Sequence, residues 1–181
     1  MRYTSKILPF VLLVFFSCVK DVDFDQTNGF VLSPVYRSAF TYFTATPAKF
    51  FDPSGTVQQN SISDVGRIDF FQNPTVAETL IQMDFLVEAR NQFNRDFTIT
   101  IEFQDDNGNP IYTLIPIIIS ANELNYTHTE VIDLRNNPQV FNTTQIVITA
   151  EVQDTGTPLN PSDTSEFEFE SAIVFYIEKR F

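Results

Sequence analysis

Residues 166–178 read Glu-Phe-Glu-Phe-Glu-Ser-Ala-Ile-Val-Phe-Tyr-Ile-Glu, and this stretch decides the fold class. Its odd-numbered positions are apolar apart from one serine, whereas its even-numbered positions begin with three glutamates. Successive side chains of a strand point to opposite faces, so a period of two predicts a strand with one buried face. We therefore expect Glu166, Glu168 and Glu170 on a solvated outer face.

The same alternation recurs in earlier segments, and Asn107-Gly108 between two of them predicts a β-hairpin turn. About eight strands are expected, over residues 30–44, 65–71, 80–89, 97–104, 111–119, 129–134, 146–152 and 167–177. The pattern predicts an all-β protein, an antiparallel β-sandwich of immunoglobulin-like or jelly-roll type. A small outer-membrane barrel is the rival architecture, and the uneven strand lengths argue against it.

The chain is strongly acidic, with 23 Asp and Glu against 11 Lys and Arg among its 181 residues. Such a surface repels phosphate backbones, so we expect no nucleic-acid binding. It also repels anionic lipid headgroups, so membrane attachment would need something other than a basic patch.

The N-terminal segment has the pattern of a signal peptide. Arg2 and Lys6 form a basic region, and residues 7–16 follow as a continuous run that is mostly apolar. This run is too short to span a bilayer, which takes about 20 residues, but it suits a signal-peptide core. The small residue Ser17 then precedes Cys18, the only cysteine, so no intrachain disulfide can form.

Phe15-Phe16-Ser17-Cys18 resembles the lipobox of bacterial lipoproteins, with Phe15 where that family usually has Leu. The resemblance implies cleavage before Cys18 and acylation of its thiol and new amino group. It implies three parts: a signal peptide (1–17), a lipidated cysteine with an acidic tether (18–28), and the β-sandwich domain (29–181).

The residues after Cys18 carry a second resemblance. Lys20 followed by Asp21, Asp23 and Asp25 is similar to the export signal of surface lipoproteins in Bacteroidota, which implies an outer-membrane, cell-surface location. These aspartates share one side of an extended chain, so a calcium site is the alternative interpretation.

The mature chain as a whole resembles the small lipoproteins of flavobacteria. The segments that carry this resemblance are 21–25, 32–35 and 173–176. No activity follows from it.

The sequence contains no pattern of catalytic, metal-binding or cofactor-binding residues, and we expect no enzyme activity. His128 is the only histidine, no Gly-x-Ser-x-Gly elbow accompanies it, and we expect it at a strand edge on the surface. A metal site would have to rely on carboxylates alone. The oxygen-rich segment 105–109 lacks the spacing of an EF-hand loop, and a hairpin turn accounts for it.

These features favour a membrane-anchored lipoprotein with a non-enzymatic interaction domain, docking on an envelope protein such as an outer-membrane β-barrel complex. The alternative is a surface carbohydrate-binding module. Because the chain has no Trp, a sugar platform would need exposed, coplanar tyrosines, namely Tyr36, Tyr42, Tyr112, Tyr126 and Tyr176. A hydrolase, the third hypothesis, would need His128 buried beside a nucleophile, or two carboxylates at catalytic separation.

Overall fold

The computed structural model describes residues 29–181. The predicted signal peptide (1–17), Cys18 and the rest of the predicted tether lie outside the described residues. The described chain divides into a large unit, residues 32–179, and a small unit, residues 29–31 with 180–181.

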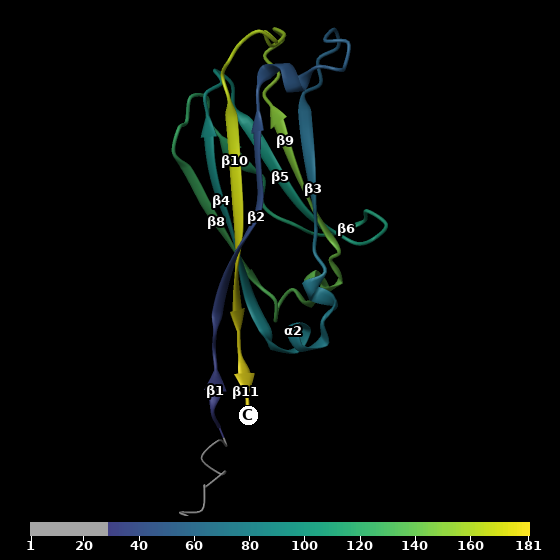
Figure 1. Cartoon of the computed structure of the whole chain (residues 1–181), viewed down its shortest axis with the longest axis vertical. Helices are drawn as coiled ribbons and strands as arrows, with labels where there is room; N and C mark the ends of the chain where they lie inside the picture. Colours follow the sequence, from purple (N-terminus) through teal and green to yellow (C-terminus); the bar gives the residue numbers. More distant parts are fainter. Residues whose placement is uncertain (1–28) are drawn as a thin grey trace, which may run out of the picture. The chain divides into compact units, whose positions relative to one another are not determined.

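The large unit is built from two antiparallel sheets (Figure 1). The first sheet has the order β2 (Val35–Ala45), β10 (Phe167–Ile177), β4 (Leu80–Asn91) and β8 (Tyr126–Asp133). The second has the order β3 (Ser61–Arg67), β9 (Gln145–Val152) and β5 (Phe97–Gln104), with β6 (Pro110–Thr113) and β7 (Ile117–Ile119) both paired to β5. The predicted all-β antiparallel sandwich is confirmed.

The strand order distinguishes between the two sandwich types. Counting β6 and β7 as one interrupted strand gives eight positions along the chain. The sheets then have the orders 1-8-3-6 and 2-7-4-5, which is the double Greek key of a jelly roll.

Aromatic side chains fill the space between the two sheets. Phe97 of β5 stacks on Phe167 of β10 with ring centroids 4.0 Å apart. Phe85 of β4 meets Phe103 of β5 edge-on at 6.3 Å. All four side chains are fully buried, so contacts between the sheets, and not only within them, hold the sandwich together.

The strand predicted over residues 65–71 is misplaced, because β3 begins at Ser61 and ends at Arg67. This strand carries two serines and an aspartate and gives little hydrophobic signal. Phe71, which suggested a strand, is buried from a 3-10 turn, η3 (Phe70–Gln72). Two further 3-10 turns are η2 (Pro47–Phe50) and η4 (Pro138–Asn142).

A short helix, α2 (Pro74–Thr79), was not predicted. Asn73 caps it by accepting a hydrogen bond from the Thr75 backbone N–H, and Pro74 occupies its first turn, where a missing N–H costs nothing. The Asn73-Pro74 pair therefore starts a helix directly after the 3-10 turn η3.

Three consecutive isoleucines at 117–119 suggest a strand buried on both faces, but only one face is buried. Ile117 and Ile119 are buried, whereas Ile118 is 63% exposed. Strand β7 pairs only with β5, and its outward face meets solvent.

In the small unit, the Gly29 N–H donates a hydrogen bond to the Phe181 carbonyl at 3.2 Å. The Phe181 N–H donates to the Phe30 carbonyl at 3.1 Å, and the two rings lie 6.3 Å apart. These bonds flank the pairing of β1 (Val31–Leu32) with β11 (Lys179–Arg180). Within residues 29–181 no helix is long and apolar enough to cross a membrane.

Candidate functional site

The candidate site lies on the outer face of the first sheet, the side turned away from the second sheet. Cross-strand partners share a face, so the register places Tyr42, Glu170, Glu88 and Thr127 in one outward row across β2, β10, β4 and β8. The next row toward the loops contains Thr44, Glu168 and Arg90.

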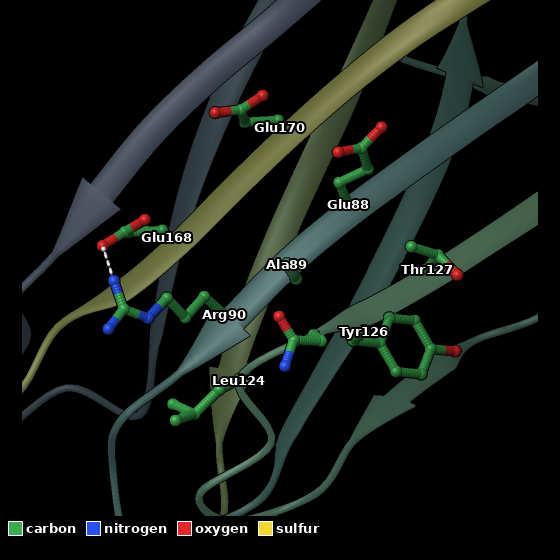
Figure 2. A pocket seen from close by; sticks show the side chains of 9 residues that line it. Glu88, Ala89, Arg90, Leu124, Tyr126, Thr127, Glu168 and Glu170 are labelled. Atoms are coloured by element: carbon green, nitrogen blue, oxygen red, sulfur yellow. Dashed lines mark hydrogen bonds and ion pairs between the residues drawn. The ribbon is translucent and has the colours of Figure 1, made fainter.

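A shallow recess of about 240 Å³ opens at this end of the face. Strands β4, β10 and β8 line it together with Leu124 and Asn125, which precede β8. Figure 2 shows Glu88 and Glu170 projecting from neighbouring strands on the same side of the sheet. The recess is open to solvent and is lined by three carboxylates and one guanidinium group.

Two ion pairs cross this face. Arg90 Nη1 lies 3.5 Å from Glu168 Oε1, and Arg37 Nη2 lies 3.9 Å from Glu88 Oε1. The Arg37–Glu88 pair is largely solvated and the Arg90–Glu168 pair is partly so, and both are long, so each contributes little to stability. They leave the carboxylate of Glu170 without an ion pair among the described residues.

Glu170 lies directly opposite Glu88 in the register of β10 and β4. Like charges at directly opposite positions destabilise a sheet, by about 0.2–1 kcal/mol relative to a neutral pair. Arg37 compensates Glu88 in part, so the carboxylate of Glu170 is the one that a positively charged group placed between the two would neutralise.

A buried asparagine holds the loop that forms one side of the recess. The Asn91 side chain is inaccessible to solvent; it donates to the carbonyls of Arg95 and Ser120 and accepts from the Phe93 N–H. Its backbone N–H donates to the Glu123 carbonyl at 2.6 Å. Asn91 thereby fixes the segment that leads into Leu124 and Asn125.

Some of the residues singled out from the sequence lie on this face, and others do not. Glu168 and Glu170 point outward from β10 as predicted, while Glu166 directly precedes that strand. His128 lies on the edge strand β8 as predicted, but it pairs with the buried Val87 and its side chain is only one-third exposed. Its Nε2 lies 3.4 Å from Glu130 Oε2, and no serine or cysteine contact to it is found among residues 29–181.

The five tyrosines do not share one surface. Tyr42 pairs with the outward Glu170, whereas Tyr36 pairs with Phe175 on the inner side of β10, so these two point to opposite faces. The Tyr112 ring packs against Phe103 in the second sheet. The remaining two are partly buried: Tyr126 and Tyr176.

The hydroxyl of Tyr176 donates to Asp84 at 2.8 Å, and this bond raises the tyrosine's pKa. Partial burial, together with the charge of Glu130, raises the pKa of Tyr112. Both side chains remain neutral donors at physiological pH. Only Tyr42 and Tyr176 face outward on the same sheet.

The Asp105–Asn109 segment forms the predicted hairpin turn between β5 and β6, with Gly108 at a φ of 78°. Asp105 accepts hydrogen bonds from the Asn109 side chain and from the backbone N–H groups of Asn109 and Asn107, which lower its pKa. Both carboxylate oxygens of Asp105 thus accept hydrogen bonds within the turn. Among residues 29–181 no group of three or more His, Cys, Asp or Glu side chains is arranged to hold a metal ion.

Arg90, Leu124 and Asn125 belong to the recess but were not singled out from the sequence. The alternation over residues 80–89 does predict that Glu88 points outward. What brings Glu88 and Arg90 beside the two glutamates of β10 is the pairing of β4 with β10, which are far apart in the chain.

No protein-family model matches this sequence, and no curated protein matches it. Solved structures with a similar fold include a protein of Parabacteroides distasonis described as secreted. It has 15% identity and a TM-score of 0.46, over 64% of this chain and 38% of that one.

Two others are the VP2 subviral particle of infectious bursal disease virus and an enzymatically active domain of tailspike protein 4 from bacteriophage CBA120. The VP2 match has 14% identity and a TM-score of 0.42, over 80% of this chain and 32% of that one. The tailspike match has 13% identity and a TM-score of 0.40, over 80% and 19%. The chain thus spans less than half of each of these proteins, and at such scores we draw no functional conclusion from them.

Proposed function

We propose that this protein is a lipid-anchored, non-enzymatic binding protein of the bacterial outer membrane, displayed at the cell surface. The outer face of the first sheet binds a basic segment of another envelope protein, such as an outer-membrane β-barrel complex. Acylated Cys18 holds the domain at the membrane, and the sandwich presents the binding face.

The opposed carboxylates of Glu88 and Glu170 are the observation that carries this proposal. They lie on an exposed face beside Tyr42, which is 61% exposed. Local rules of sheet pairing are broken mainly where function requires it, because a neutral pair would be more stable. A lysine or arginine of a partner would satisfy both carboxylates, and Tyr42 offers an aromatic contact for the same side chain.

The sequence of the leader supports the anchor. Removal of residues 1–17 takes away two basic residues and no acid, so nine Lys and Arg remain against 23 Asp and Glu. Such a chain has little electrostatic attraction to a bilayer, whereas two or more acyl chains give stable attachment. A chain this acidic would therefore need a lipid, such as one on Cys18, to stay at the membrane.

The test is purification of the native acylated protein in mild detergent, with partners identified by mass spectrometry. The wild type is compared with the double variant Glu88→Gln/Glu170→Gln. The matched control is Glu151→Gln, which removes one exposed carboxylate from β9 in the other sheet.

We expect one membrane protein to be retained by the wild type and by the control, with retention falling as salt rises, and to be lost from the double variant. The double variant should fold about as stably as the wild type, because the opposed carboxylates and the solvated Arg37–Glu88 ion pair that it removes each contribute little. Equal retention by all three proteins would refute binding through this face.

The carbohydrate-binding alternative stays a prediction. Of the five tyrosines, only Tyr42 and Tyr176 face outward on one sheet, and the hydroxyl of Tyr176 is already bound to Asp84. Binding on a glycan array that Tyr42→Ala abolishes would favour it over a protein partner.

A further inference from the structure

Strand β2 forms one edge of the first sheet (Figure 1), and its first five residues, 35–39, are all exposed. The strand at the other edge, β8, differs, because its inward-facing side chains are at least partly covered. Tyr36 of β2 lies on the inner side of the sheet and is still 57% exposed. The start of β2 is therefore a free edge with an uncovered aromatic ring, a surface that another strand can pair with.

The first residues of β2 have backbone groups that no strand of the sheet uses. The Pro34 carbonyl points toward β10, since it accepts a hydrogen bond from the Ile177 N–H at 3.1 Å. Successive residues of a strand direct their backbone groups to opposite edges, so the groups at the free edge belong to Val35, Arg37 and Ala39. The Ser38 hydroxyl donates to the Ala39 carbonyl at 3.1 Å, which leaves that carbonyl a second lone pair.

A recess of about 400 Å³ opens beside this stretch and is lined by Ser38 and Phe40. Its apolar wall also contains Phe70 and Phe175, whose rings lie edge-on with centroids 4.7 Å apart. Phe175 is the register partner of Tyr36, so the exposed tyrosine ring and the recess lie on the same side of the sheet. The recess therefore suits an aromatic ring presented from a neighbouring strand.

The rim of the recess carries two opposite charges. Arg67 and Asp69 both line it and both are exposed. Neither side chain forms an ion pair with another residue of the described chain. Such a surface is complementary to itself across a two-fold axis, because the cation of each copy can then face the anion of the other. The charge at this edge is balanced, although the chain as a whole is strongly acidic.

We propose that two copies of this chain pair in antiparallel fashion through the free edge of β2, with the two-fold axis at Ser38. Arg37 of each copy exchanges backbone hydrogen bonds with Ala39 of the other. Tyr36 of each copy lies opposite Phe40 of the other and enters its recess. A pairing centred on Ser38 also keeps the two arginines from lying directly opposite each other.

The pairing is limited to two copies. Pro34 lacks an N–H and precedes the free stretch, and a bulge between Ala39 and Thr41 follows it. Both features protect an edge from longer pairing, and a two-fold contact uses the same edge of each copy, so no further copy can add there. The first sheets of the two copies become one sheet, with both outer faces on the same side. The dimer thus presents two copies of the candidate site in one direction.

The test is a disulfide cross-link at the two-fold axis. In this register Ser38 of the two copies forms a non-hydrogen-bonded pair with Cα atoms about 4.5 Å apart, within the range of about 4.4–6.8 Å that disulfides span. The full-length acylated protein carrying Ser38→Cys is oxidised with copper phenanthroline in its native membrane, and covalent dimer is measured on a non-reducing gel. The control is Thr129→Cys, an exposed position on β8, the other edge strand. The wild type sets the background.

We expect a several-fold higher yield of covalent dimer from Ser38→Cys than from Thr129→Cys. In the Ser38→Cys protein, the further change Tyr36→Ala should lower the yield. Tyr42→Ala is the matched control, since Tyr42 is 61% exposed on the outward side of the same strand, and it should leave the yield unchanged.

Charge reversal tests the two-fold arrangement itself. Arg67→Glu or Asp69→Lys, each added to Ser38→Cys, should lower the yield, because each variant brings like charges together across the axis. Co-expression of the two reversed chains should restore it, since one chain then carries two acids at the rim and the other two bases. Both residues are exposed, so the reversals should leave the fold intact.

Equal yields from Ser38→Cys and Thr129→Cys would overturn the pairing, because random collisions in the membrane would then account for both. Charge reversals without effect, or reversed chains whose mixture gives no more dimer than either alone, would overturn it as well. Covalent dimer from the wild type would contradict the proposed lipid on Cys18. The excess of Ser38→Cys over that background would still decide the pairing through β2.

Discussion

Replacement of Asn91 by Leu tests how the loop beside the recess is held. The side chain is completely buried and makes three hydrogen bonds of 2.8, 2.8 and 2.9 Å with backbone groups of Arg95, Ser120 and Phe93. Leu has a similar volume, so the change removes the hydrogen bonds and leaves the packing largely unaltered. Each buried backbone group left without a partner costs about 1–3 kcal/mol, so we expect a loss of about 3–5 kcal/mol.

Urea denaturation followed by far-ultraviolet circular dichroism measures this loss, with a constant m-value as the check on two-state unfolding. Asn142→Leu is the matched control, since Asn142 is an exposed asparagine at the end of η4 and its replacement should change stability by no more than about 0.5 kcal/mol. A loss below about 1 kcal/mol for Asn91→Leu would refute the reasoning, because the three backbone groups would then have found other partners.

Three further changes test other parts of the fold. Gly66→Ala places a Cβ against the Phe40 ring, so it should cost about 1–3 kcal/mol in urea denaturation, and a Phe40→Leu background should remove most of that cost. Arg95→Met removes a buried guanidinium that donates to the carbonyls of Gln153, Thr157 and Pro158 in the loop after β9. Limited proteolysis should cleave this loop faster in the variant than in the wild type. An unchanged cleavage rate would contradict the proposal that Arg95 holds the loop. Asp52 has its pKa lowered from 3.8 to about 2 by the Ser54 hydroxyl and by backbone N–H groups. Its contribution to stability is therefore complete above pH 3.8 and is lost as the pH falls toward 2, so Asp52→Asn should make the melting temperature fall less steeply over that range.

Several strands could be predicted closely because one face of each is buried in the core. In β10 the buried Phe167, Phe169 and Ile173 alternate with residues that face outward, and the same holds for β4 and β5. A period of two is a local signal, so no knowledge of the partner strand is needed.

Other features depend on contacts between distant segments. The order of strands that makes the fold a jelly roll follows from the pairing of β2 with β10 and of β3 with β9, which no local pattern encodes. Strand β3 itself contains few apolar residues and was placed too late along the chain. The recess needs both the register of β10 against β4 and the loop held by Asn91, so only its carboxylates could be predicted.

The interpretation of the whole molecule rests on a lipid carried by Cys18. The most direct test is the mass of the N-terminal fragment of the protein purified from its native membrane. We predict a fragment that begins at Cys18 and carries acyl chains on the thiol and the amino group. A fragment with an unmodified Cys18, or one that retains residues 1–17, would contradict the account.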